Sequence, residues 1–238
     1  LLIRTVYNLS MIDAGFERSR LVTFQVSLAP ADYPQFPARP QFFPLLQDRL
    51  RGTAGLQGAS AMSGLPPNRP LNGNDTDIGN YTAPPEGPFE NVDYYQSVMT
   101  NYFETMGIPI VKGRSFQLSD AVSGPVVIVN ETLVNTFWKD RDPIGQTLKP
   151  GFGPFNQVPD FTVIGVAKDV KQGGVDKKTG TEIYTLIDQL AMSKPPINFV
   201  PTTLHMVLRT TLPPASLRTY RTGFYEVRTG LSEIEGRE

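Results

Sequence analysis

The stretch from Pro125 to Leu148 reads PVVIVNETLVNTFWKDRDPIGQTL and decides how the chain folds. Its first five residues, 125–129, form an apolar run of the length that a buried strand needs. Asn130 suits the N-cap of a helix over Glu131–Trp138, because its side chain can accept a hydrogen bond from an early N–H group of the helix. Asp142–Gly145 then has turn chemistry, since Asp bonds to its own backbone and Pro143 fixes φ. The stretch predicts a strand, a helix and a turn in succession.

The expected helix over Glu131–Trp138 carries its apolar side chains in two pairs. Leu133 is four residues from Phe137, and Val134 is four residues from Trp138, the single tryptophan of the chain. Side chains at this spacing lie on one face of a helix. We therefore expect Leu133, Phe137 and Trp138 to pack inward, and we interpret the whole stretch as a scaffold without a catalytic role.

A strand, a helix and a second strand are expected nearer the N-terminus. Leu21–Leu28 alternates polar and apolar residues, which predicts a strand with one buried face. Phe42–Arg51 has apolar residues at helical spacing, and Leu56–Ser60 reads as the next strand. These segments predict a β-α-β unit. Its expected buried residues are Val22, Phe24, Val26, Leu28, Phe43, Leu46 and Leu50.

A second unit of the same order follows further along the chain. Strand Val92–Met99, helix Asn101–Met106 and strand Ile108–Val111 predict another β-α-β unit. The remaining expected elements are strand Phe161–Val166, a hairpin-like turn over Gln172–Gly180, strands Glu182–Ile187 and Leu204–Arg209, and a last helix from Ala215 to Val227.

Residues 64–88 are rich in proline and also contain Asn72-Gly73-Asn74-Asp75. Such composition favours turns over packed elements. We expect a long surface loop with at most a short strand over Ile78–Thr82. A loop of this length inside a compact domain is uncommon unless it has a function or is disordered.

The composition excludes several classes of function. With 22 Lys and Arg against 23 Asp and Glu, the chain has no overall attraction to nucleic acid or anionic lipid. The sequence has no cysteine and one histidine, His205, which excludes thiolate catalysis, disulfides and nearly all zinc, copper and non-haem iron sites. We interpret His205 as a strand residue, and the basic group Lys168, Lys171, Lys177 and Lys178 as a solvated loop.

Known catalytic and binding motifs are incomplete in this sequence. Gly58-Ala59-Ser60 lacks the second glycine of a nucleophile elbow, and Lys178-Thr179-Gly180 has no S-x-x-K to accompany it. No P-loop motif occurs. Asn72–Asp77 has the oxygen density of a calcium loop without its glycine or its final glutamate, so we interpret it as a solvated turn. The closeness of Asp140 and Asp142 in the sequence says nothing about the separation across a cleft that a glycosidase pair needs, and turn chemistry explains Asp142 better. We assign no catalytic, cofactor-binding or metal-binding residue.

No run of 18 apolar residues is present, so the sequence predicts no complete membrane span. The chain nevertheless starts with Leu1-Leu2-Ile3, and an apolar stripe continues to Ile12. Ala14-Gly15 provides a helix end, because glycine readily adopts the left-handed cap conformation. A helix that leaves a membrane and a helix that packs on a core are both open from this pattern.

Four blocks in this order resemble the extracytoplasmic core domain of MacB/FtsX-like ABC transporter permeases. They are DAGFERSRLVTFQVSL (13–28), NYFETMGIPIVKGRSF (101–116), PVVIVNETLVNTFWKDRDPIGQTL (125–148) and FTVIGVAKDVKQGG (161–174). The resemblance covers about residues 1–210, and it depends on the order of all four blocks rather than on any one of them.

The resemblance implies an α+β fold with a porter-like part of two β-α-β units and a smaller inserted mixed α/β lobe. Residues 1–15 would be the end of a transmembrane helix and its linker. Residues 16–115 and 191–230 would form the porter-like part, and residues 116–190 the inserted lobe. Further transmembrane helices would flank the domain in the full-length protein.

The resemblance also implies a place and a role. The domain would lie on the periplasmic side of the bacterial inner membrane, bind no cofactor and transmit ATP-driven conformational change during export or envelope processes. Its partners would be an ABC-type ATPase and either a periplasmic adaptor or a second permease copy. The alternative is a soluble extracytoplasmic module in which the 64–88 loop binds a ligand or peptide.

Overall fold

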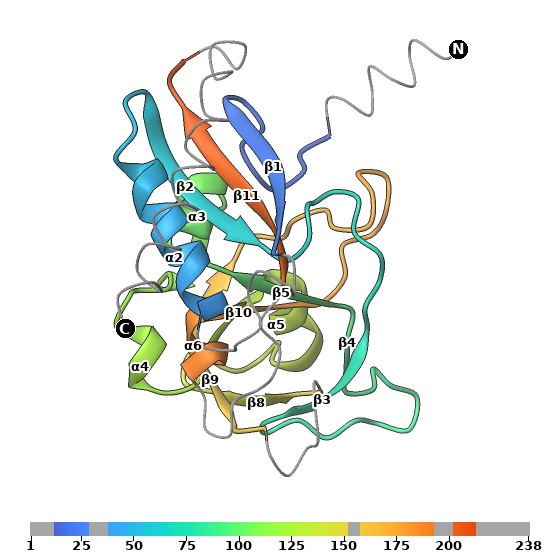
Figure 1. Ribbon diagram of the computed structural model, residues 1–238. Coiled ribbons are helices and arrows are strands. Elements are labelled where there is room, and N and C mark those ends of the chain that lie inside the picture. Colours follow the sequence, from blue (N-terminus) through green and yellow to red (C-terminus); the bar gives the residue numbers. More distant parts are fainter. Residues whose placement is uncertain (1–11, 29–37, 152–157, 193–201, 213–238) are drawn as a thin grey trace, which may run out of the picture.

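The computed structural model describes residues 12–28, 38–151, 158–192 and 202–212 (Figure 1). The strands in these ranges are β1 (Leu21–Ser27), β2 (Leu56–Met62), β3 (Asn74–Ile78), β4 (Asn91–Val92), β5 (Tyr94–Val98), β6 (Ile110–Gly113), β7 (Val126–Asn130), β8 (Thr147–Pro150), β9 (Phe161–Ala167), β10 (Glu182–Leu186) and β11 (Thr203–Thr210). The helices are α2 (Ala38–Arg51), α3 (Tyr102–Met106), α4 (Asp120–Ser123), α5 (Glu131–Phe137) and α6 (Ile187–Met192). The expected helix up to Ile12 and the last helix, 215–227, lie outside the described residues, apart from Ile12 itself.

The eleven strands join one mixed sheet in the order β1-β11-β2-β5-β10-β7-β9-β8-β3-β4, and β6 pairs with β9 beside this path. Few and mostly short helices accompany it, which confirms the α+β class (Figure 1). No helix within the described ranges is both long and apolar enough to cross a membrane. The division into 16–115 with 191–230 and an inserted lobe over 116–190 stays a prediction.

The stretch 125–148 folds as its pattern predicts. β7 passes directly into α5, and the Asn130 side chain caps the helix by accepting a hydrogen bond from Leu133 N at 3.0 Å. Asp142 Oδ1 accepts a hydrogen bond from Ile144 N at 2.9 Å, and Gly145 has a φ of +84°. The expected turn chemistry is therefore confirmed.

The first β-α-β unit has a different pairing from the simplest expectation. β1, α2 and β2 occur where the pattern predicts them. β11 lies between the two strands, however, and is antiparallel to both. Strands β1 and β2 are thus parallel but not neighbours, because a segment from far along the chain fills the space between them.

The prediction of a second β-α-β unit is wrong. The expected strand Val92–Met99 is divided into β4, the last strand of the sheet beside β3, and β5, which lies between β2 and β10. β6 pairs antiparallel with β9, whereas β5 pairs parallel with β10. Helix α3 therefore connects two strands that do not pair with each other.

The prediction of a hairpin-like turn over Gln172–Gly180 is also wrong. β9 and β10 do not pair, because β7 lies between them and is parallel to β9 and antiparallel to β10. The segment between β9 and β10 therefore passes over the end of β7 instead of reversing directly.

The long loop contains more structure than its composition indicates. β3 covers Asn74–Ile78, so it ends where the expected short strand, Ile78–Thr82, begins. It pairs with β8 and β4, and Thr76 and Ile78 are buried. The interpretation of Asn72–Asp77 as a solvated turn is therefore wrong, because cross-strand pairing outweighs the turn propensity of its residues.

Helices α2 and α3 both pack on β2. One buried cluster joins α2 to apolar residues of β1, β2 and β11. Another joins α3 to the next residues along the same strands, including Met62 and Val207. Since successive side chains of a strand point to opposite faces, the two helices cover opposite faces of this part of the sheet.

A third buried cluster joins α5 to β7, β9, β10, β8 and β3. Leu133, Phe137 and Trp138 belong to it, which confirms the expected inward face. The Trp138 indole N–H donates to Gly79 O at 2.9 Å. The residue at the end of α5 thus holds the chain just after β3.

Asp120 anchors the segment that leads into β7. The Arg114 guanidinium donates to both of its carboxylate oxygens at 2.7 Å, and Gln117 N donates to Oδ2 at 2.8 Å. Burial would raise the pKa of Asp120, but these hydrogen bonds outweigh it and the net pKa is lowered from 3.8. The pair therefore stabilises the fold while Asp120 is ionised.

We expect Asp120→Asn to lower the free energy of unfolding by about 1–3 kcal/mol at neutral pH, because it weakens charge-assisted hydrogen bonds to a buried group. Since the folded-state pKa lies below 3.8, the difference from the wild type should persist down to that pH and shrink only as the pH falls further. Urea denaturation at several pH values measures it. Asp140→Asn, at an exposed carboxylate, is the control. A constant difference across the acid range would contradict the role of the charge.

Candidate functional site

His205 and the lysines of the basic group do not form one site. His205 is half-buried on β11, opposite Gln25 of β1 and Met62 of β2. Lys168 pairs with Asp13 at 2.7 Å, and Lys171 Nζ donates to Lys177 O at 2.7 Å. In the described part of the chain, no group of three or more His, Cys, Asp or Glu side chains is placed to hold a metal ion.

The centre of the sheet contains a buried polar network that the sequence analysis does not predict. Arg69, from the long loop, donates through Nη1 to Glu182 Oε1 at 2.6 Å and to Gln172 Oε1 at 2.9 Å. Its Nη2 donates to Tyr95 O at 2.6 Å, and its guanidinium lies 5.4 Å from the ring centre of Tyr94. Both charged side chains of the pair are at most 5% exposed.

Glu182 has further donors around its second oxygen. The Tyr184 hydroxyl donates to Oε2 at 2.6 Å and Gln172 Nε2 donates at 2.5 Å. Burial raises the pKa of Glu182, while Arg69 and the two neutral donors act in the opposite direction. Burial also raises the pKa of Tyr184, and the nearby carboxylate adds to that effect. The network therefore consists of neutral hydroxyl and amide groups around one ion pair, an arrangement suited to holding segments together.

Asn130 links this network to α5. Its Oδ1 accepts from Glu182 N at 2.9 Å in addition to capping the helix. Its Nδ2 donates to Asp169 Oδ1 at 2.8 Å and to Gly180 O at 2.9 Å. Asp169 in turn accepts from the backbone N–H and the hydroxyl of Thr132 at 2.9 and 2.6 Å. One amide side chain thus fixes β7, β10, α5 and the segment after β9.

The segment after β9 also holds the first described part of the chain. Lys168 Nζ donates to Asp13 Oδ2 at 2.7 Å, and Lys171 N donates to Ala14 O at 3.0 Å. Gly15 has a φ of +84°, and a Cβ atom placed on it would lie 2.0 Å from Asp169 O. Glycine is required here by both its conformation and the close approach. Residues 13–15, which we call the leading segment, are therefore connected by direct contacts to the central network.

The signals for the network are weak in the sequence. Arg69 stands among prolines in a segment that predicts irregular backbone, and Glu182 is the one charged residue of the strand segment EIYTL. A charged residue at such a position indicates a buried partner, because buried charges are paired. The partner is 113 residues away, so no local pattern identifies it.

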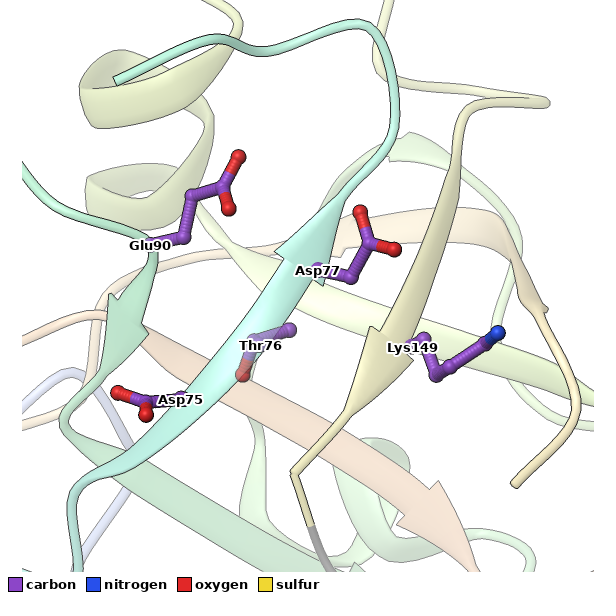
Figure 2. Close-up of a pocket in the computed structure, with 5 residues that line it drawn as sticks. All are labelled: Asp75, Thr76, Asp77, Glu90 and Lys149. Atoms are coloured by element: carbon purple, nitrogen blue, oxygen red, sulfur yellow. The ribbon is translucent and has the colours of Figure 1, made fainter. Parts of the chain in front are cut away.

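A hollow of about 540 Å³ lies beside β3 and β8. It is lined by Asp75, Thr76, Asp77, Glu90 and Lys149, and we call it the acidic hollow (Figure 2). Figure 2 shows Asp77 and Lys149 on adjacent strands, where their backbones are directly opposite. Lys149 Nζ lies 3.6 Å from an oxygen of Asp160.

The acidic hollow by itself does not indicate a ligand. None of the buried polar side-chain atoms that lack a partner in the described ranges belongs to its lining. Strand β3 explains the arrangement of its acids, since Asp75 and Asp77 share one face and alternate with buried residues. Two of the three acidic residues of the hollow are therefore the ordinary exposed residues of β3.

We expect Arg69→Ala to lower the free energy of unfolding by about 3–5 kcal/mol, because it leaves the Glu182 carboxylate buried without its cation. The control is Lys112→Ala, which removes one member of an exposed pair with Asp142 at 3.0 Å and should lose at most about 1 kcal/mol. The double variant Arg69→Ala/Glu182→Gln should lose less than the sum of the two single losses. Urea denaturation measures all four variants. Equal losses for the Arg69 and Lys112 variants would contradict the structural role of the network.

We expect Gly15→Ala to be more destabilising than Gly145→Ala. Both glycines have a φ of +84°, so the strain of a left-handed alanine, about 1–2 kcal/mol, is shared. Gly145 has no atom within 4 Å of an added Cβ, whereas Gly15 meets the backbone of Asp169. The additional loss should be about 1–3 kcal/mol. Denaturation of both variants measures it, and equal losses would show that the leading segment is not held by this contact.

This chain is similar to a known protein family and to several solved structures. The model of the MacB-like periplasmic core domain matches residues 9–211. A comparison with curated proteins gives no match. Among solved structures, the periplasmic region of MacB from Actinobacillus actinomycetemcomitans is similar, with 13% identity and a TM-score of 0.51, over 94% of this chain and 95% of that chain.

Two further solved structures are similar at lower scores. The extracellular domain of the noncanonic ABC-type transporter YknZ from Gram-positive bacteria has 15% identity and a TM-score of 0.47, over 83% of this chain and 88% of that chain. A permease-protein domain from Porphyromonas gingivalis has 14% identity and a TM-score of 0.48, over 90% of this chain and 85% of that chain. The family match includes every block that carries the resemblance in the sequence, and the MacB structure shares the fold. This chain therefore belongs to the MacB-like periplasmic core domain family of ABC transporter permeases.

Proposed function

We propose that this domain passes ATP-driven movements of the membrane part of a permease to a substrate or partner protein outside the cytoplasm. An ABC-type ATPase supplies the movement, and the domain itself catalyses no reaction. The full-length permease lies in the bacterial inner membrane with this domain on its periplasmic side. A periplasmic adaptor or a second permease copy receives the movement or shares it.

The observation that carries this proposal is the continuous path of contacts from the leading segment to the centre of the sheet. Asp13 and Ala14 are bonded to Lys168 and Lys171, and Gly15 lies against Asp169. A displacement of the leading segment therefore acts directly on the segment after β9. That segment cannot move alone, because Asp169 is bonded to Asn130 and Thr132.

The sheet is built to move as one body. The central network joins β10 to the long loop through Arg69 and to α5 through Asn130. Three clusters of buried apolar residues fill the spaces between the helices and the sheet. Close-packed interiors have low compressibility and transmit displacement. A push on one end of such a sheet is therefore passed to the other end.

The alternative, a soluble extracytoplasmic module that binds a ligand or peptide with the 64–88 loop, stays a prediction. The loop is held by strand pairing of β3 and by Arg69, which leaves less of it available to close on a ligand. A nucleotide-independent thermal shift with a peptide or small molecule would favour this alternative over transmission.

The intact permease, assembled with its ATPase, tests the proposal. The 238-residue sequence has no cysteine, so Asp48→Cys on α2 and Asp160→Cys before β9 give specific label sites once any cysteines elsewhere in the assembly are replaced. Both side chains are mostly exposed, so labelling should leave the fold intact. Pulsed electron-spin resonance gives the distance between the two labels. Energy transfer from Asp160→Cys to a labelled lipid gives the distance of the domain from the membrane.

We expect ATP to change the distance from the domain to the membrane and to leave the distance between the two labels unchanged. This combination is the signature of a rigid body that moves as a whole. A nucleotide-dependent change between the two labels would show that the sheet absorbs the movement. No change in either distance, in a preparation that hydrolyses ATP, would show that the domain does not transmit it.

A further inference from the structure

The charged residues of this chain are unevenly distributed. The formal charge of the whole sequence is −1, so no overall attraction to an anionic surface is built in. Residues 70–111 nevertheless contain no Lys or Arg, whereas lysines are concentrated in residues 168–178, which we call the basic loop. The lysines of the basic loop are Lys168, Lys171, Lys177 and Lys178.

Hydrogen bonds hold the basic loop in place beside the leading segment. Lys171 N donates to Ala14 O at 3.0 Å, which joins the loop to residues 13–15. Lys171 Nζ donates to Lys177 O at 2.7 Å, and Lys177 N donates to Gly174 O at 3.2 Å. The loop is therefore closed by its own bonds, and its position relative to the leading segment is fixed.

The lysine side chains of the basic loop face solvent. The side chain of Lys177 is 68% exposed and that of Lys168 is 41% exposed. Lys178, next to Lys177, is also exposed. Their ammonium groups are therefore accessible to a partner.

Nearby carboxylates offset only part of this positive charge. Asp13 pairs with Lys168 at 2.7 Å, and Asp176 lies 3.5 Å from Lys177. Asp169 points into the domain, where it accepts hydrogen bonds from Asn130 and Thr132. With four lysines against these two aspartates of its own, the basic loop has an excess of positive charge at the surface.

The opposite end of the domain is acidic. Asp75, Asp77 and Glu90, which belong to the segment without Lys or Arg, line the acidic hollow beside β3. Figure 1 shows the leading segment and the basic loop toward one end of the domain, and β3 with β8 toward the other. The domain therefore has a positive end, where the leading segment lies, and a negative end away from it.

The surface of the basic loop is charged without an apolar centre. Protein partners are usually bound through a patch whose core is apolar. None of the large apolar side chains that are exposed in the described part of the chain belongs to the leading segment or to the basic loop. A layer of phosphate groups needs no apolar contact, so this surface fits anionic lipid headgroups better than a protein.

We propose that the basic loop binds the anionic headgroups of the membrane in which the permease lies. This inference rests on the proposed function, because that function places the domain against the periplasmic side of the membrane. A cluster of lysines next to a membrane-spanning segment is typical of binding to anionic lipid. The leading segment joins the domain to the chain that would enter the membrane, so the loop bonded to it faces the headgroups. The acidic end is repelled by the same surface and faces away.

Vesicle binding of the 238-residue chain tests the proposal. Vesicles of phosphatidylcholine and phosphatidylglycerol in equal amounts should bind the chain, and vesicles of phosphatidylcholine alone should not. Added salt should weaken the binding, because it screens exposed charges. Co-sedimentation measures the bound fraction. Equal binding to both kinds of vesicle would overturn the proposal. Polyglutamate that binds as tightly as the anionic vesicles would indicate an acidic protein as the partner and would overturn it as well.

Matched variants locate the surface that binds. Lys177→Gln/Lys178→Gln should weaken vesicle binding at least about tenfold, because each lysine near an anionic surface contributes about a factor of five. Lys139→Gln/Arg141→Gln removes the same charge from exposed residues just after α5 and should leave the binding nearly unchanged. Asp176→Asn removes a carboxylate from beside Lys177 and should strengthen the binding several-fold. Circular dichroism checks the fold of each variant. Equal losses for the two double variants would show that binding follows net charge alone, which would overturn the proposal.

The vesicle test separates this inference from the proposed transmission, because it contains neither ATPase nor nucleotide. If the chain does not bind anionic vesicles while the domain of the intact permease still moves with ATP, the lipid contact alone is refuted. If the chain binds the vesicles through the basic loop while the domain does not move with ATP, the transmission alone is refuted.

Discussion

The fold depends on the ion pair between Arg69 and Glu182 at the centre of the sheet. A buried carboxylate is stable only where donors surround it, because the interior offers no water to replace them. Its donors come from the long loop, from the segment after β9 and from β10 itself. The hydrogen bonds to this one carboxylate therefore bring three distant parts of the chain together. Displacing any of them removes a donor from the Glu182 carboxylate or exposes it to solvent.

The same constraint explains why the long loop is ordered. Residues 64–88 have few apolar side chains, so burial alone would hold them weakly. Arg69 fixes the first part, and the pairing of β3 with β8 fixes the second. Trp138 then holds Gly79 just after the strand. A composition that favours turns is thus overruled at three points by contacts with parts of the chain far away in sequence.

What the sequence could predict follows from the range of each interaction. Each of β1, α2, β7, α5 and β11 has an apolar period or an apolar run within its own length, and the structure places all five elements where these local patterns predict them. Their neighbours in the sheet could not be predicted, because strands that pair can be far apart in the sequence and no local pattern identifies the partner. β11 enters between β1 and β2, and β6 pairs with β9, without any local signal for either. The pairing of Arg69 with Glu182 could not be predicted for the same reason, whereas the capping role of Asn130 could, because a helix cap depends on neighbouring residues.

Within the described ranges, the two end strands of the sheet, β1 and β4, differ in length and in their flanking residues. β4 has only two residues, and Glu90 and Asp93 flank them. A short strand with charged neighbours offers little for another chain to pair with. β1 has seven residues and a regular ladder with β11, and Arg20 directly precedes it. Within the described ranges, the two end strands therefore differ in how many backbone groups they present beyond their single pairing partner.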